Sequence, residues 1–153
     1  MNYIGIDPGK AGGIAVLWED GTATAWDLPD DEVSLAKLFA NEATAGYQPR
    51  FLRCALEKQQ ARPPNGRIGC FNIGVSYGMV RGALACFSIS TRFVSPRTWQ
   101  TIFDNRKKDE DIKLTSLKMA RRLFPTVDLH RKKDNGKSDA LLIALWLKKQ
   151  EAS

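Results

Sequence analysis

Four acidic residues stand where regular elements of the chain are expected to begin or end. Asp7 and Glu57 each close an apolar run typical of a buried strand, and Asp134 and Asp139 flank the start of an apolar C-terminal segment. Carboxylates gathered in one place repel one another and raise one another's pKa, so a cation is needed to hold them together. All-oxygen ligands suit Mg²⁺, with Mn²⁺ able to substitute. Two such ions about 4 Å apart would support phosphodiester hydrolysis.

Each acid also has a simpler interpretation when it is taken alone. Asp7 lies in an Asp-Pro-Gly turn, Asp134 in Asp-Asn-Gly, and Asp139 in the first turn of an expected helix, all places where structural aspartates are common. It is the combination that favours a metal site. Other chemistries lack support, because the single histidine, His130, has no accompanying nucleophile pattern and Gly5–Ala11 departs from the phosphate-loop spacing.

The elements that would position these acids follow from the apolar pattern and from turn residues. Strands are expected at 2–7, 13–18, 23–27, 51–57 and 91–94. Helices are expected over 30–45, 71–87, 95–103, about 111–124 and 138–147. The helix near 111–124 should turn Leu114, Leu117, Ala120, Leu123 and Phe124 inward, and Ser138 should cap the last helix. The polar stretch 58–69, with its Pro-Pro-Asn-Gly centre, is expected to be an irregular loop.

This element order is that of the ribonuclease-H-like fold, an α/β class. It predicts a mixed five-stranded sheet, made of a three-stranded antiparallel meander plus two parallel strands and flanked by helices. The length of 153 residues, with 43% hydrophobic and 26% charged residues, indicates one soluble globular domain, so residues 1–153 are expected to form a single ribonuclease-H-like domain. No apolar run is long enough for a membrane span, no signal peptide is evident, and three cysteines without ligand spacing indicate reduced thiols and a cytoplasmic location.

The positive charge is confined to one part of the chain. Residues 1–105 carry ten Lys/Arg and ten Asp/Glu, whereas residues 106–153 carry thirteen Lys/Arg against seven Asp/Glu, which accounts for the whole net charge of +6. A basic region of this kind indicates a polyanionic partner. Solvated helix faces also collect lysines, so the charge alone favours nucleic acid only modestly.

The chain resembles the RuvC-type Holliday junction resolvases, especially phage-type members and the plant chloroplast junction resolvase. The resemblance covers essentially the whole length and rests on the segments 5–9, 56–57, 71–84, 96–99, 121–125 and 132–144. It implies that Asp7, Glu57 and Asp139 are catalytic, metal-binding acids. Bacterial members place the last two acids three residues apart, where this chain has Gly136. Asp134, five residues before Asp139, has the spacing of the phage and chloroplast forms and is the expected fourth ligand.

The resemblance also implies a homodimeric, Mg²⁺-dependent endonuclease with two ions in each active site. Such an enzyme places paired symmetric nicks across a four-way DNA junction and leaves 5′-phosphate and 3′-hydroxyl ends. The glycine-rich helix 71–87 resembles the dimerisation element. Alternatives are the same chemistry on other branched or replicative phage DNA or on RNA–DNA hybrids, and a non-catalytic DNA-structure-binding protein. The compact chain favours a phage origin, and thus the cytoplasm of a bacterial host.

Residues for DNA contacts are expected in the loop after residue 57 and in the basic region. Gln59, Arg62 and Phe71 would lie near the junction crossover and probe or stack on unpaired bases. Basic side chains would contact phosphates and make binding strongly salt-dependent. The candidates for these phosphate contacts are Lys107, Lys108, Lys113, Lys118, Arg131, Lys132, Lys133 and Lys137.

Overall fold

The fold is built on a five-stranded sheet with the strand order β3-β2-β1-β4-β5 in a computed structural model that describes residues 1–103 and 111–152. The strands are β1 (Asn2–Asp7), β2 (Gly13–Leu17), β3 (Ala23–Asp27), β4 (Leu52–Glu57) and β5 (Ser90–Val94). β1, β2 and β3 pair in antiparallel fashion, whereas β4 lies parallel to β1 and β5 parallel to β4. The predicted fold class and mixed sheet are therefore confirmed.

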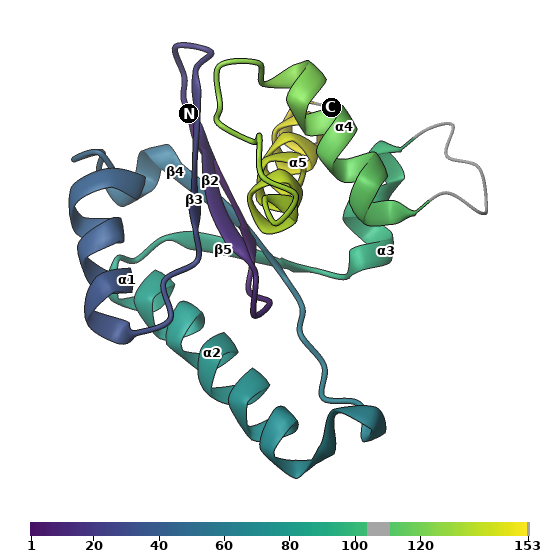
Figure 1. The fold of residues 1–153 in the computed structure, drawn as a ribbon. Coiled ribbons are helices and arrows are strands. Elements are labelled where there is room, and N and C mark those ends of the chain that lie inside the picture. Colours follow the sequence, from purple (N-terminus) through teal and green to yellow (C-terminus); the bar gives the residue numbers. More distant parts are fainter. Residues whose placement is uncertain (104–110, 153) are drawn as a thin grey trace.

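Helices cover both faces of this sheet (Figure 1). They are α1 (Glu32–Leu38), α2 (Gly66–Cys86), α3 (Pro96–Trp99), α4 (Ile112–Leu123) and α5 (Asn135–Glu151). A π-helical turn, Phe39–Ala43, continues α1, and short 3-10 turns lie at 49–51, 63–65 and 100–102. α5 packs on one face together with α3 and α4, while α1 and α2 lie on the other. No helix in the described ranges is long and apolar enough to cross a membrane.

The two helical layers rest on alternate residues of the same strands. Ile4 and Ile6 of β1 are fully buried in the cluster shared with α1 and α2, whereas Ala55 of β4 belongs to the cluster shared with α5. This alternation follows from the two-residue period of a strand. The central strands are therefore buried on both sides, which explains why β1 and β4 read as continuous apolar runs.

Two glycines let α5 approach the sheet backbone directly. A Cβ at Gly5 would lie 2.0 Å from the carbonyl oxygen of Ala140, and one at Gly136 would lie 2.0 Å from that of Ala11. Gly136 also forms an isolated bridge with Gly12 in the turn after β1. The N-terminal end of α5 is thus seated against the end of β1, so residues in its first turns lie beside Asp7.

The structure corrects three local predictions. α2 begins at Gly66, not at residue 71, because Pro63-Pro64 form a 3-10 turn that is closed by a hydrogen bond from the Arg62 amide to Asn65 Oδ1. The predicted irregular loop is therefore wrong over 63–69. Leu114 and Leu123 are 50% and 40% exposed, so α4 does not turn them inward.

The start of α5 also differs from the prediction. The helix begins at Asn135 with Asp134 as its N-cap residue, so Ser138 lies within the first turn and does not cap it. The Ser138 hydroxyl instead donates to the backbone oxygen of Asp134 at 2.9 Å. The Asp-Asn-Gly sequence, which suggests a turn, is in this chain the beginning of the helix.

Candidate active site

Asp7 and Glu57 lie side by side at one end of the sheet. β1 and β4 run parallel with Ile6 opposite Leu56, so the next residue of each strand occupies the neighbouring position. Side chains alternate along a strand, and both Gly5 and Ala55 face α5. Asp7 and Glu57, two residues further on, therefore point to the same face. This is the juxtaposition that the sequence predicts.

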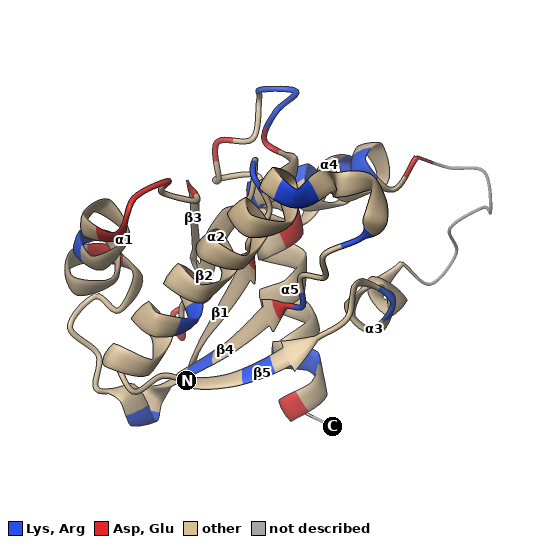
Figure 2. Ribbon diagram, turned by 90° about the horizontal axis from the view of Figure 1, so that it is seen from below, with Lys and Arg blue, Asp and Glu red and all other residues tan. Residues whose placement is uncertain are grey.

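Asp139 reaches this pair from α5, one residue before the Ala140 carbonyl that rests on β1. Its Oδ1 is buried and has no hydrogen-bond partner, and the buried Ser116 hydroxyl beside it also lacks a partner with hydrogen-bonding geometry. Asp7 and Glu57 both raise the pKa of Asp139 through charge repulsion. The three carboxyl groups thus occupy one partly buried region. Figure 2 shows acidic positions (red) at this end of the sheet, below the helix α4 with its basic positions (blue).

Burial is the main influence on all three carboxyl groups. It raises the pKa of Asp7, although the Gly9 amide and the Lys113 charge lower it. It raises the pKa of Glu57 to about 7, against a hydrogen bond from Trp99 and with a further increase from Asp7. It raises the pKa of Asp139 to about 7, with Ser116 and Lys113 opposing. Without a cation, the site disfavours its own ionisation.

These residues fit a divalent cation that binds oxygen. An orphaned, buried carboxylate oxygen beside two further acids is the environment that such an ion would satisfy. Across residues 1–103 and 111–152, no group of three or more acidic, histidine or cysteine side chains is placed so that it could hold a metal ion. The three acids therefore form no complete set of ligands in the metal-free structure, and Mg²⁺ suits such a site because this ion keeps several waters and takes only one or two carboxylates from the protein.

Asp134 is engaged by basic side chains in the structure, and its role as a fourth metal ligand stays a prediction. Its side chain is fully buried, and its Oδ2 accepts from the Arg131 amide at 2.8 Å. Its Oδ1 accepts from Arg131 Nε at 2.8 Å and lies 3.2 Å from Lys137 Nζ. Burial would raise the pKa of Asp134, but the hydrogen bonds from Arg131 and Lys137 outweigh it and lower that pKa.

Arg131 extends this ion pair across the molecule. Its Nη2 also donates to both carboxylate oxygens of Asp27 at the end of β3, at 3.0 and 2.9 Å. Lys137 in turn donates to the backbone oxygen of Asp128 at 2.7 Å. Arg131 and Lys137 therefore hold the segment before α5 in this structure, and their contacts with phosphates stay a prediction. The pattern Arg-x-x-Asp-x-x-Lys over residues 131–137 could have indicated these ion pairs in the sequence.

The remaining predicted DNA contacts fall into four groups. Gln59 and Arg62 line a cavity of about 880 Å³ that also reaches Glu57. Phe71 is 71% exposed on α2 but does not line that cavity. The basic candidates that are exposed in the structure are Lys113, Lys118, Lys132 and Lys133. Lys107 and Lys108 lie outside the described residues.

Sequence reasoning missed further polar residues that line the same cavity, among them Arg97 and Gln100. Both belong to the short segment that follows β5, where Pro96 begins α3. The proline and its preceding serine were recognisable as a helix start, so the side chains of this helix could have been included among the candidates.

The raised pKa values predict that the metal-free protein loses stability as the pH rises. An acid with a higher pKa in the folded than in the unfolded state releases its proton on unfolding, so the free energy of unfolding falls between about pH 5 and pH 8. We expect a decrease of about 5 kcal/mol, about half of it from each carboxyl group. Denaturant unfolding at pH 5 and pH 8, with a chelator present, measures this change in the free energy of unfolding. Glu57→Gln should flatten the dependence, and a free energy that rises with pH would contradict it.

Comparisons with known proteins bear on the fold. No protein-family model matches the chain, and no curated protein matches it in sequence. RuvC of Thermus thermophilus in complex with Holliday junction substrate aligns with a TM-score of 0.63 and 17% identity, over 99% of this chain and 96% of that chain. Another T. thermophilus RuvC structure aligns with a TM-score of 0.59 and 19% sequence identity, over 99% of this chain and 97% of that chain. The yeast mitochondrial Holliday junction resolvase aligns with a TM-score of 0.49 and 17% sequence identity, over 97% of this chain and 78% of that chain. The chain therefore has the fold of RuvC.

Proposed function

We propose that this chain, which has the fold of RuvC, is a Holliday junction resolvase that makes paired symmetric nicks in four-way DNA. The observation that carries the proposal is the meeting of Asp7 and Glu57, on adjacent parallel strands, with Asp139 on α5. It is supported by the RuvC structure of the same fold, which is bound to Holliday junction substrate. The products would have 5′-phosphate and 3′-hydroxyl ends.

In this proposal Asp7, Glu57 and Asp139 hold Mg²⁺, or Mn²⁺ in its place, with two ions in each site. The bound ions would activate a water molecule and stabilise the leaving oxygen of the phosphodiester. The Gly9 amide donates to Asp7 Oδ1 at 3.0 Å, which fixes that carboxylate in the turn after β1. Lys113 offsets part of the negative charge of Asp7 and Asp139.

DNA would cross the site along the basic side of the protein. Arg62 and Arg97 in the cavity beside Glu57 offer cationic groups to a strand whose phosphate lies at the acids. Exposed Lys118 on α4 and Lys132 before α5 extend the positive surface. These contacts neutralise phosphates, so junction binding should weaken steeply with salt.

The proposed substrate is tested by comparing branched and unbranched nucleic acids. Four-way junctions, three-way junctions, linear duplex and RNA–DNA hybrid of matched sequence are incubated with the protein and Mg²⁺. Cleavage confined to the four-way junction, at symmetric positions, supports a resolvase. Equal cleavage of three-way DNA would assign the chain to branched DNA in general, and cleavage of the hybrid alone would overturn the proposal in favour of a ribonuclease.

A homodimer would supply the two active sites that paired nicks require. α2 is 21 residues long, yet only Val80 and Leu84 of it are buried. Ile68, Phe71 and Val75 are exposed on it, and a Cβ at each of its four-residue-spaced glycines would meet nothing within 4 Å. An apolar helix with this open glycine face suits close packing against α2 of a second copy. Those glycines are Gly74, Gly78 and Gly82.

Gly78→Leu is therefore expected to break the dimer without unfolding the protomer. The added side chain has free space in the protomer but would prevent close helix approach between copies. Light scattering coupled to gel filtration measures the mass, with Gln150→Leu adding the same side chain at another exposed helix position. A wild-type monomer, or a Gly78→Leu variant that dimerises like the wild type, would contradict this arrangement.

A further inference from the structure

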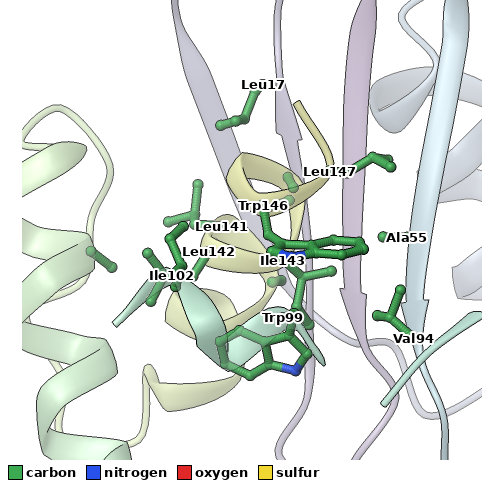
Figure 3. Close-up of a cluster of buried hydrophobic side chains, with 14 of the residues drawn as sticks. Leu17, Ala55, Val94, Trp99, Ile102, Leu141, Leu142, Ile143, Trp146 and Leu147 are labelled. Carbon is green, nitrogen blue, oxygen red and sulfur yellow. The ribbon is translucent and has the colours of Figure 1, made fainter. Parts of the chain in front are cut away.

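The indole of Trp99 is directed at the candidate active site from inside the core. Trp99 is only 1% exposed, and its Nε1 donates to Glu57 Oε2 at 2.5 Å. Figure 3 shows its ring within the cluster that lies between α5 and the strands, together with Trp146 and Val94. A buried indole N–H requires an acceptor. In this chain the acceptor is the carboxylate of a candidate metal ligand.

The indole ring of Trp99 is itself held in place, so it can fix the Glu57 carboxylate to which it donates. Ser95 Oγ accepts from the Thr98 amide at 3.2 Å, which caps α3 at its start, and Pro96 is the first residue of that helix. Phe103 packs edge-on against the indole, with ring centroids 5.9 Å apart. Trp99 therefore cannot turn away from Glu57 without opening a cavity in the core.

The backbone around Glu57 adds to this fixation. Glu57 pairs with Val94 in the register of β4 and β5, and the Lys58 amide donates to the Val94 oxygen at 2.7 Å. The strand that carries Glu57 and the strand that leads into α3 are thus tied at the same level. The sheet therefore holds the backbone of Glu57 next to the start of α3, the helix that carries Trp99.

We propose that Trp99 is a positioning residue that fixes Glu57 Oε2 and leaves Oε1 to bind the metal ion. This inference rests on the proposed function. The indole N–H can donate but not accept, so it engages a lone pair of one carboxylate oxygen and favours a ligand that binds the ion through the other oxygen. Partners that orient a ligating group contribute typically tenfold to a hundredfold to metal affinity or activity.

Trp99→Phe tests this role, because it keeps an aromatic ring but removes the donor. Titration calorimetry with Mn²⁺ on the DNA-free protein should show affinity reduced about 10- to 100-fold. For junction cleavage, kcat should fall while KM for the junction stays unchanged. Trp146→Phe is the matched control, since Trp146 is 6% exposed in the same cluster and should keep wild-type Mn²⁺ affinity.

The outcomes separate the two proposals. If the wild type binds no Mn²⁺, the proposed function fails, whereas wild-type affinity in Trp99→Phe overturns only the role of Trp99. Equal weakening in Trp146→Phe would assign the effect to core packing and also overturn it. Should Trp99→Phe not fold, the indole N–H signals of ¹⁵N-labelled wild type provide the test. The Trp99 signal should move in Glu57→Gln and on addition of Mg²⁺, and an unmoved signal would overturn the proposal.

Discussion

Asp7→Asn is expected to reduce the nicking of a four-way junction by about a thousandfold or more. Asp7 is the acid at the end of the central strand, and both Glu57 and Asp139 sense its charge. An asparagine keeps the shape and the hydrogen bond from the Gly9 amide but loses the charge that a cation needs. Burial disfavours the ionised form of Asp7 and raises its pKa. The neutral asparagine avoids this cost, so the variant should be at least as stable as the wild type in the absence of metal.

Binding and cleavage must be measured separately for this variant. Gel-shift titration without Mg²⁺ should give junction affinity equal to or tighter than that of the wild type, since a negative charge near DNA has been removed. Asp30→Asn, at an exposed position between β3 and α1, is the matched control and should cleave normally. Cleavage by Asp7→Asn at the wild-type rate would exclude Asp7 from the metal site.

Asp134→Asn is expected to lower the free energy of unfolding by about 3 kcal/mol. The fully buried carboxylate is the counter-ion of Arg131 and of the 8%-exposed Lys137. Neutralising it leaves Lys137 buried in the first turn of α5 without a counter-ion, at the place where this helix packs on the turn after β1. The loss should appear in metal-free protein by denaturant unfolding.

The same experiment distinguishes an ion-pair role from a metal-ligand role. Asp27→Asn is the control, because Asp27 pairs with the same Arg131 but its side chain is 60% exposed, so its loss should cost less than about 1 kcal/mol. A metal ligand would behave differently. Its replacement would leave the metal-free stability unchanged or raised and would abolish stabilisation by Mn²⁺, and that outcome would identify Asp134 as a metal ligand.

The sheet and the central pair of acids were predictable because they depend on local patterns. Strand ends are marked by Asp-Pro-Gly after β1 and by Glu-Lys-Gln after β4, and parallel pairing then brings Asp7 and Glu57 together. Asp139 followed from the apolar helix behind it. Each step needed only the period of a strand or helix and a recognisable terminus.

The parts that sequence reasoning missed depend on contacts across the fold. The pairs of Asp134 with Arg131 and Lys137 are local, but the further pairing of Arg131 with Asp27 spans more than a hundred positions. Nothing local in the sequence marks Trp99 as a partner of Glu57, and the hydrogen bond between them joins residues 42 positions apart. Long-range pairing of this kind leaves no periodic signal in the chain.

The central claim is most directly tested on a mobile four-way junction that is labelled on each strand in turn, with and without Mg²⁺. The proposed chemistry predicts no cleavage in chelator. With Mg²⁺ it predicts nicks at symmetric positions on two opposing strands, which DNA ligase reseals because the ends are 5′-phosphate and 3′-hydroxyl. Binding of the junction with no nicking in Mg²⁺ or Mn²⁺ would contradict the claim and leave a DNA-structure-binding protein.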